Sequence, residues 1–414
     1  MPTEPVTAET RIVVIGAGLA AAKAVQTLRE EGFDGFVTLI GDEPERPYER
    51  PALSKDVLQG NAELGDLFVH ESDWYAEHAI DTRFGNAAVS IDRQARIVVL
   101  DPAEAIAYDR LLIATGAEPN VLSLPGADAS NVFSLRRISD SDNLRTAFVG
   151  AKTAVVIGAG WIGLEVAASA RAAGLAVTVL ESADLPLQRV LGDELAGYFA
   201  DLHRRNGVDL RTSVTVSGFE LIDGRVSSVQ FDNTSIPADI VIVGIGVSPN
   251  DELAREAGLD VDNGIQVDEH LRTSDPHVFA AGDVANAYNS ALRESVRVEH
   301  WDNAIRQGQL AARSMLGQDV DYDWQPYFFT DQFDVGMEYV GRGSAADDVV
   351  IRGDRDSGEF IAFWLRDGVV TAGMNVNVWD VNEDIRALIG STVDRARIAD
   401  TSLALAHNEG LKDE

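Results

Sequence analysis

RIVVIGAGLAA at residues 11–21 and TAVVIGAGWIG at residues 153–163 are two copies of one pattern. In each copy an apolar strand runs into a glycine-rich turn, and the turn opens a helix that a later glycine closes. A second strand then follows and ends at an acid, Asp42 in the first copy and Glu181 in the second. Such a complete unit is typical of dinucleotide binding, whereas a lone glycine turn often serves packing alone. Two complete units therefore predict two dinucleotide sites.

Each part of the unit has its own physical reason. The first glycine permits the tight turn, and the second lets a pyrophosphate approach the backbone. The third position lets the helix pack closely on the strand, where alanine also serves. The helix N-terminus offers free N–H groups and a favourable dipole to the pyrophosphate. A carboxylate at Glu181 would bond the 2′-hydroxyl of NADH and repel the 2′-phosphate of NADPH, so we expect NADH; the alternative is that Glu181 only caps the strand end.

The amino-acid composition excludes several classes of cofactor and partner. The 414 residues include no cysteine, which excludes disulfides, thiolate nucleophiles and protein-held iron–sulfur clusters. The seven histidines show no metal-ligand spacing, so we expect no metal, and redox electrons must sit on an organic cofactor. A net charge of −33 disfavours nucleic acid and anionic membranes as partners. The polar start and the glycine-broken apolar stretch 154–170 predict neither a signal peptide nor a membrane span, and we expect a cytoplasmic protein.

The remaining pattern predicts an α/β fold class, with two Rossmann-like, three-layer dinucleotide-binding domains and a small α+β C-terminal domain. The expected domains are 1–117 with 246–323, then 118–245, then 324–414. Local predictions include a hairpin over 214–231, a short strand at 279–283 followed by a helix, and a hairpin turned at Asp367-Gly368. A C-terminal helix is predicted over 380–389, because Asp380 and Glu383 have capping-box spacing.

A third motif, RPYERPALSK at residues 46–55, resembles the RPYxRPxLSK segment of FAD-dependent ferredoxin reductases that serve oxygenases and cytochromes P450. ATG at 114–116, AGD at 281–283, and EHW at 299–301 before a helix over 303–315 support the resemblance. The similarity runs from about residue 11 to the C-terminus. It implies a glutathione-reductase-like plan in which hydride passes from NADH to FAD.

Residue roles follow from the resemblance position by position. For FAD it implies contacts from Gly16, Gly18, Leu19, Ala20, Asp42, Glu43, Arg50, Lys55, Val89, Ala114, Thr115, Gly116, Arg136, Gly282, Asp283, Glu299, His300 and Trp301. For NADH it implies contacts from Gly158, Gly160, Trp161, Ile162, Gly163 and Glu181. Gly246 and Phe329 complete the expected cofactor-binding residues. Core packing explains His300 and Trp301 almost as well as a cofactor contact does.

Two residues are expected to be catalytic. Lys55 corresponds to the lysine beside flavin N5, where it would stabilise negative charge on the reduced ring. A buried lysine needs a partner, and Glu165 is the candidate; the alternative is that both side chains are exposed. At Phe329 the family usually has tryptophan. Phenylalanine still stacks, with less area and no N–H donor, so we expect altered nicotinamide stacking and retained activity.

Sister families such as glutathione reductase need a redox cysteine, so their chemistry is excluded. We expect the electron acceptor to be a small iron–sulfur ferredoxin or rubredoxin-like protein. A reductase of a small acceptor (a quinone, a monodehydroascorbate-like radical or O2) and a non-catalytic redox sensor are the alternatives. Because ferredoxins are commonly acidic, a local basic face is needed, with Arg136-Arg137 and the group Arg293, Arg297 and Arg306 as candidates. The expected oligomeric state is a monomer or a weak homodimer.

Overall fold

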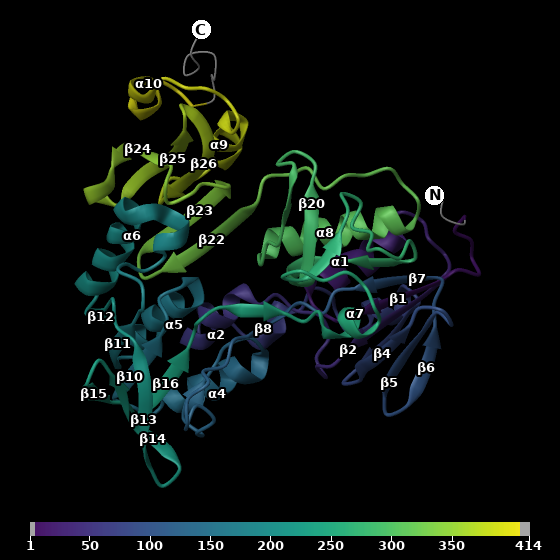
Figure 1. The fold of residues 1–414 in the computed structure, drawn as a ribbon, viewed down its shortest axis with the longest axis horizontal. Coiled ribbons are helices and arrows are strands. Elements are labelled where there is room, and N and C mark those ends of the chain that lie inside the picture. Colours follow the sequence, from purple (N-terminus) through teal and green to yellow (C-terminus); the bar gives the residue numbers. More distant parts are fainter. Residues whose placement is uncertain (1–4, 406–414) are drawn as a thin grey trace. The chain divides into compact units, whose positions relative to one another are not determined.

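The computed structural model describes residues 5–405 of the chain (Figure 1). The chain forms two compact units. The first unit comprises Met1–Arg50, Leu64–Glu118 and Val247–Trp324, and the second comprises Pro51–Glu63, Pro119–Gly246 and Gln325–Glu414. The predicted α/β fold class is confirmed, whereas the exact division into three domains stays a prediction.

The first unit is built on a parallel five-stranded sheet in the order β19-β7-β1-β2-β3. Its strands are β1 (Arg11–Ile15), β2 (Phe36–Gly41), β3 (Ile80–Phe84), β7 (Arg110–Ile113) and β19 (Val278–Ala280). Residues 12–15 and 111–113 are at most 3% exposed, which explains why these strands are continuous apolar runs rather than alternating ones.

Two helices of the first unit, α1 (Leu19–Glu30) and α8 (Trp301–Met315), lie side by side (Figure 1). They approach each other closely at Gly308, where a Cβ atom would lie 2.2 Å from the carbonyl oxygen of Ala20. Only glycine leaves room for this crossing, because such an overlap forces the backbones apart.

The second unit contains a parallel sheet in the order β12-β11-β10-β16-β9. Its strands are β9 (Val132–Phe133), β10 (Thr153–Ile157), β11 (Ala176–Leu180), β12 (Asp209–Arg211) and β16 (Ile240–Val243). The associated helices are α4 (Ile138–Phe148), α5 (Trp161–Ala172) and α6 (Gln188–Arg205). The predicted hairpin forms from β13 (Val216–Ile222) and β14 (Arg225–Phe231), and β15 (Thr234–Pro237) adds a third strand.

The second unit also contains an antiparallel sheet formed by the C-terminal residues, in the order β22-β23-β26-β25-β24. Its strands are β22 (Tyr327–Gln332), β23 (Val335–Gly341), β24 (Asp348–Asp354), β25 (Glu359–Arg366) and β26 (Val369–Val376). Asp367 and Gly368 both have positive φ and make the tight turn that their sequence predicted. Helices α9 (Asn382–Leu388) and α10 (Arg395–Ala399) accompany this sheet.

The remaining elements are short. They are η1 (Pro51–Ser54), α2 (Asp56–Gln59), η2 (Leu64–Leu67), α3 (Trp74–Glu77), β4 (Ala87–Asp92), β5 (Ile97–Asp101), β6 (Glu104–Ala107), β8 (Ala117–Pro119), β17 (Val247–Pro249), α7 (Glu252–Glu256), β18 (Ile265–Val267), η3 (Gly282–Val284), β20 (Ala285–Asn289), β21 (Glu294–Val296) and η4 (Arg355–Ser357). None of the helices between residues 5 and 405 combines the length and the hydropathy that a bilayer crossing requires.

Two local predictions were wrong. The strand at 278–280 is followed by the single turn η3 and then by strand β20, not by a helix. The predicted capping box does not form, because Asp380 has φ +60°, a left-handed conformation, and α9 begins two residues later at Asn382. An N-cap residue normally has extended backbone angles, so Asp380 belongs to the preceding turn.

The helix crossing predicts opposite effects for two glycines. Gly308→Ala should destabilise the protein by about 1–3 kcal/mol, because the new methyl group overlaps the backbone of α1. Gly197→Ala, in α6 with nothing within 4 Å of the added Cβ, should stabilise it by about 0.5–1 kcal/mol. Urea unfolding followed by circular dichroism measures both, and equal stability of the two variants would contradict the close crossing.

Candidate functional site

The first glycine turn shows why each glycine is needed. Gly16 has φ +99°, and a Cβ there would lie 2.1 Å from the carbonyl oxygen of Ala114. A Cβ at Gly18, in contrast, would meet nothing within 4 Å. Helix α1 begins next to this open space with no side-chain cap and no acid in its first turn. Its free N–H groups therefore fit an anion such as a pyrophosphate.

The second glycine turn repeats this geometry. A Cβ at Gly158 (φ +98°) would lie 2.3 Å from the carbonyl oxygen of Gly244, and one at Gly160 would meet nothing within 4 Å. Helix α5 also starts without a side-chain cap or an early acid. The third position differs between the turns, since a Cβ at Gly163 would lie 2.3 Å from the carbonyl oxygen of Gly158, whereas Ala21 is accommodated.

Glu181, the acid after β11, is hydrogen-bonded to the second glycine turn. Its Oε2 accepts a hydrogen bond from the backbone N–H of Ala159 (2.6 Å), and its Oε1 accepts one from the N–H of Ala183 (2.8 Å). The carboxylate thus caps local N–H groups, accepts from the Ser182 hydroxyl (3.2 Å) and keeps acceptor capacity for one further hydroxyl donor. Asp42, the equivalent acid of the first copy, is exposed.

The RPYERPALSK motif supplies a charged cluster in the first unit. Arg50 donates to Glu43 (2.6 Å) and to the Tyr48 hydroxyl (2.7 Å), and Tyr48 donates to the second oxygen of Glu43 (2.6 Å). The carboxylate of Asp283 also acts electrostatically on Arg50. This cluster fixes the guanidinium of Arg50 in one orientation, as an anion-binding arginine requires.

Polar groups around the ATG and AGD motifs are held in place. Thr115 Oγ1 donates to the carbonyl of Asn250 (2.7 Å), and Asn250 Nδ2 donates back to the carbonyl of Thr115 (2.9 Å). The N–H of Gly282 donates to Gln307 Oε1 (2.9 Å).

Helix α8 carries buried polar atoms that have no hydrogen-bond partner. Among them are Gln307 Nε2 and Asn303 Oδ1, on side chains that are at most 1% exposed. Unpaired buried polar atoms are costly and fit a site that a polar cofactor completes. The sequence prediction missed both residues, although their i, i+4 spacing just after the EHW motif was the signal that places them on one helix face.

The second unit contains a buried ion pair between the two residues expected to be catalytic. Lys55 Nζ lies 3.2 Å from Glu165 Oε1, and their side chains are 11% and 7% exposed. Lys55 Nζ also lies 3.8 Å from Asp331, whose side chain is 58% exposed, and 4.7 Å from the ring centre of Phe329. The structure brings these residues together, and their catalytic roles stay predictions.

Glu165 is surrounded by hydrogen-bond donors that the sequence prediction did not assign to the site. The Ser54 hydroxyl donates to Oε2 and the Thr330 hydroxyl to Oε1, both at 2.5 Å. Burial raises the pKa of Glu165, while Lys55 and the two hydroxyls act in the opposite direction. The three neighbours therefore favour the ionised carboxylate, whereas burial opposes it.

The predicted site residues divide between the two units. Those in the first unit are Gly16, Gly18, Leu19, Ala20, Asp42, Glu43, Arg50, Val89, Ala114, Thr115, Gly116, Gly282, Asp283, Glu299, His300 and Trp301. Those in the second unit are Lys55, Arg136, Gly158, Gly160, Trp161, Ile162, Gly163, Glu165, Glu181, Gly246 and Phe329.

Several predicted contacts have a structural role in this fold. Val89 is the extra residue of a β-bulge in β4 and is 46% exposed. The backbone N–H of Arg136 donates to Asp140 at the start of α4 (3.0 Å). Trp161 packs against Phe199 and Phe328, whereas its neighbour Ile162 is 42% exposed.

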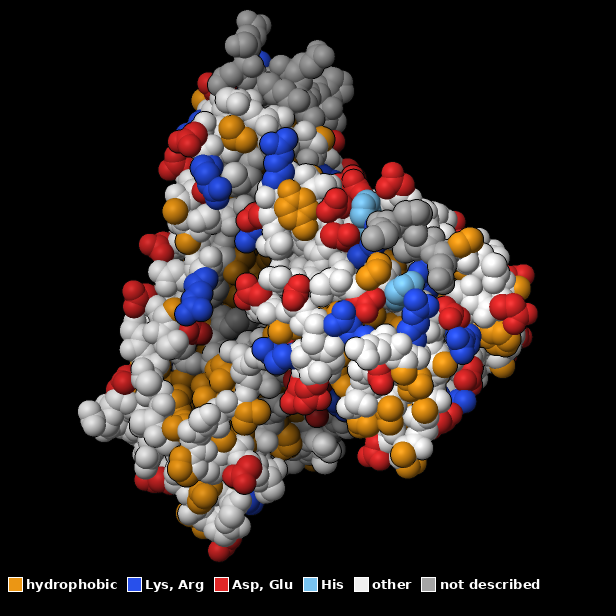
Figure 2. All heavy atoms as spheres, turned by 45° about the vertical axis from the view of Figure 1, so that its right-hand side comes forward, with side chains coloured by type: hydrophobic (Ala, Val, Ile, Leu, Met, Phe, Trp, Pro, Cys, Tyr) orange, Lys and Arg blue, Asp and Glu red, His pale blue; other side chains and the backbone are white. Residues whose placement is uncertain are grey.

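The candidate basic face is weaker than the sequence indicated. Arg297 pairs with Glu299 (2.5 Å) and Arg306 with Asp302 (2.9 Å), so two of the suggested arginines are neutralised locally. On the face shown in Figure 2, acidic and basic side chains are interspersed.

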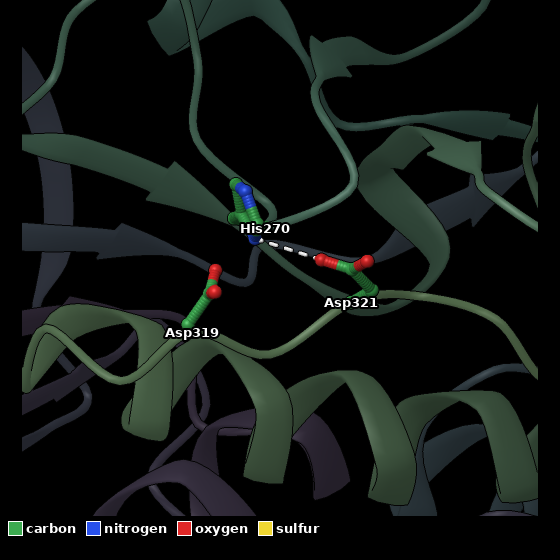
Figure 3. Close-up of side chains that lie close together, drawn as sticks. All are labelled: His270, Asp319 and Asp321. Atoms are coloured by element: carbon green, nitrogen blue, oxygen red, sulfur yellow. Dashed lines mark ion pairs between the residues drawn. The ribbon is translucent and has the colours of Figure 1, made fainter.

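One histidine lies among carboxylates, which the sequence spacing did not predict. Each of His270, Asp319 and Asp321 has a potential ligand atom within 4.8 Å of the others (Figure 3). His270 Nδ1 lies 2.8 Å from the carbonyl oxygen of Val320 and 3.2 Å from Asp321 Oδ1. Because a carbonyl only accepts, Nδ1 carries the proton, and its hydrogen bond joins His270 to the loop that contains Val320 and Asp321.

Comparisons with known proteins agree with this geometry. The family described as pyridine nucleotide-disulphide oxidoreductase matches residues 10–308, and the one described as reductase C-terminal matches residues 327–408. Rhodocoxin reductase of Rhodococcus erythropolis is 39% identical, with 97% of this chain and 96% of that protein aligned. The ferredoxin–NAD(+) reductase component of the anthranilate 1,2-dioxygenase system of Burkholderia cepacia is 38% identical over 95% and 98% of the two chains.

A solved structure extends the likeness to three dimensions. The reductase in a covalent putidaredoxin reductase–putidaredoxin complex superposes with a TM-score of 0.93, at 35% identity over 96% of this chain and 98% of that one. The chain therefore belongs to the pyridine nucleotide-disulphide oxidoreductase family, in the branch that carries the reductase C-terminal domain and includes the rhodocoxin and putidaredoxin reductases.

Proposed function

We propose that this chain is an NADH-dependent FAD flavoprotein that delivers electrons to a small iron–sulfur ferredoxin of an oxygenase or cytochrome P450 system. The observation that carries the proposal is the pair of uncapped glycine-turn helices in a chain without cysteine. Two dinucleotide cradles supply a donor site and a resident cofactor site. The missing thiols remove the disulfide chemistry for which the family is named. The names of the relatives support the ferredoxin partner.

The first unit has the groups that suit FAD. The N–H groups at the start of α1 would hold the pyrophosphate, and the oriented guanidinium of Arg50 would add hydrogen bonds to it. The unpaired atoms of Asn303 and Gln307 would find their partners on the polar edges of the cofactor. When bound, FAD supplies a ring that accepts a hydride and releases electrons one at a time.

The second unit has the groups that suit NADH and the charge of a reduced ring. The open space at Gly160 would admit the NADH pyrophosphate, and Glu181 would accept from a ribose hydroxyl. The ammonium group of Lys55, held by Glu165, would stabilise negative charge on the reduced flavin. A cytoplasmic location stays a prediction.

The proposed acceptor can be tested by coupled turnover. Reduction of cytochrome c by NADH should depend on an added ferredoxin, because the ferredoxin carries the single electrons to the cytochrome. Turnover with a quinone or O2 alone at the same rate would instead favour a small-molecule reductase. Negligible turnover with a long-lived reduced protein would favour a redox sensor.

Lys55→Met should slow flavin reduction by NADH about ten- to a hundredfold in stopped-flow measurements, because the cation beside the developing charge is lost. FAD retention, measured by visible absorbance, should change much less. The exposed Lys152 provides the matched control, and Lys152→Met should leave the rate unchanged. Adding Glu165→Gln to Lys55→Met should recover fold stability without recovering the rate, since it removes the unpaired buried carboxylate. A normal reduction rate in Lys55→Met would remove the proposed role.

Glu181→Gln should reduce the preference for NADH over NADPH by about ten- to a hundredfold in kcat/KM, because the charge that repels a 2′-phosphate is lost and one charged hydrogen bond becomes neutral. Asp184, an exposed carboxylate nearby that accepts from Ser213, is the control position. If the unmodified protein had equal kcat/KM values for NADPH and NADH, Glu181 would only cap backbone N–H groups and would not select the cofactor.

A further inference from the structure

The second unit contains a fully buried histidine to which the proposed function gives no role. His203 lies near the end of α6, is 0% exposed, and packs edge-to-face against Phe333 at 5.1 Å between ring centres. Its Nε2 lies 2.9 Å from Gln332 Oε1, and its Nδ1 has no hydrogen-bond partner.

Hydrogen bonds connect His203 to Glu165 through two side chains of β22. Gln332 Nε2 donates to Thr330 Oγ1 (3.2 Å), and the Thr330 hydroxyl donates to Glu165 Oε1 (2.5 Å). Gln332 Oε1 can only accept, so His203 Nε2 must be the donor at the far end. That assignment leaves Nδ1 unprotonated, in agreement with its lack of an acceptor.

Every donor in this series of hydrogen bonds is directed towards Glu165 Oε1, the carboxylate oxygen that also faces Lys55. Aligned hydrogen bonds in a dry interior polarise one another, so each link strengthens the next. The series of hydrogen bonds also joins three elements. His203 belongs to α6, Thr330 and Gln332 belong to β22, and Glu165 belongs to α5.

We propose that His203, Gln332 and Thr330 form a relay that keeps Glu165 ionised as the counter-ion of Lys55, with all three acting as positioning residues. The link to catalysis rests on the proposed role of Lys55 at the flavin. The relay itself rests on the geometry alone.

The charges around Glu165 agree with this role. The charged group that faces it directly is Lys55; Asp331 lies beyond Lys55, and Asp56 acts on Asp331. Burial lowers the pKa of His203 to about 4, so the imidazole stays neutral at physiological pH and the direction of the relay does not reverse. Burial raises the pKa of Glu165, and the hydrogen bond from Thr330 lowers it. Removing the Thr330 hydroxyl should therefore raise the pKa of Glu165.

Thr330→Val tests the relay, because valine keeps the shape and removes the hydroxyl. The pH profile of flavin reduction by NADH should keep its form while its acid limb moves to higher pH by about one pH unit, as expected for one lost hydrogen bond to a charge. Thr330→Ser should restore the original profile. His203→Phe, which keeps an aromatic ring but no donor, should shift the limb in the same direction by less.

A second readout does not need turnover. In holoenzyme labelled with ¹³C at the glutamate carboxyl, the Glu165 resonance, assigned with Glu165→Gln, should titrate at higher pH in Thr330→Val than in Thr330→Ser. Thr371→Val is the matched control, since Thr371 also donates to a carboxylate, that of Asp347 (2.8 Å), in the C-terminal sheet. It should leave the Glu165 titration unchanged.

Identical Glu165 titrations in Thr330→Val, Thr330→Ser and the unmodified protein would overturn the relay. A shifted titration with an unchanged reduction profile would also overturn the proposal, because Glu165 would then not govern Lys55. If the unmodified protein failed to reduce its flavin with NADH, the proposed function would fall, while the carboxyl titration would still decide whether the relay exists.

Discussion

At Gly16 the turn after β1 approaches the carbonyl of Ala114 so closely that any side chain would overlap it, and at Gly158 the turn after β10 makes the same approach to Gly244. This steric constraint determines where the following helices can start. It directs the N-termini of α1 and α5 towards the open space at Gly18 and Gly160. The proposed binding of two dinucleotides would depend on these two backbone approaches, because the dipoles and free N–H groups of the helices act only where the turn places them.

The two units then supply different chemistry around a common plan. In the first, Arg50, Glu43 and Tyr48 hold one another, and α8 presents polar atoms with no partner in the protein. In the second, a lysine and a glutamate are buried together and surrounded by hydroxyl donors. The first arrangement suits a group that stays bound, and the second suits charge that appears and disappears during a reaction.

Much of this could be predicted from the sequence, because the deciding patterns are local. The apolar strands, the glycine turns and the Asp367-Gly368 hairpin each lie within a few residues, and all formed as predicted. Predictions failed where a short sequence pattern is compatible with two local conformations. Asp380 has the composition of a helix cap, yet its left-handed backbone makes it a turn residue.

The environment of Glu165 could not be predicted in the same way. Ser54 lies 111 residues before it and Thr330 lies 165 residues after it, and no local pattern reports such contacts. The sequence of this segment predicts a role only for Phe329, whereas the hydroxyl of Thr330 and the carboxamide of Gln332 connect Glu165 to His203. Likewise, the grouping of His270 with two aspartates depends on how a distant loop returns to it.

The imidazole of His203 also bears on how this protein could be engineered. It leaves Nδ1 buried without a partner, and its lowered pKa means that fold stability present above the ordinary histidine range is lost as the pH falls towards 4. A hydrocarbon of similar shape would avoid both penalties but would leave the buried Oε1 of Gln332 without its donor. A search for heat- or acid-resistant variants would therefore favour replacing His203 and Gln332 together, and the resulting protein would gain robustness at the expense of control over the charge of Glu165.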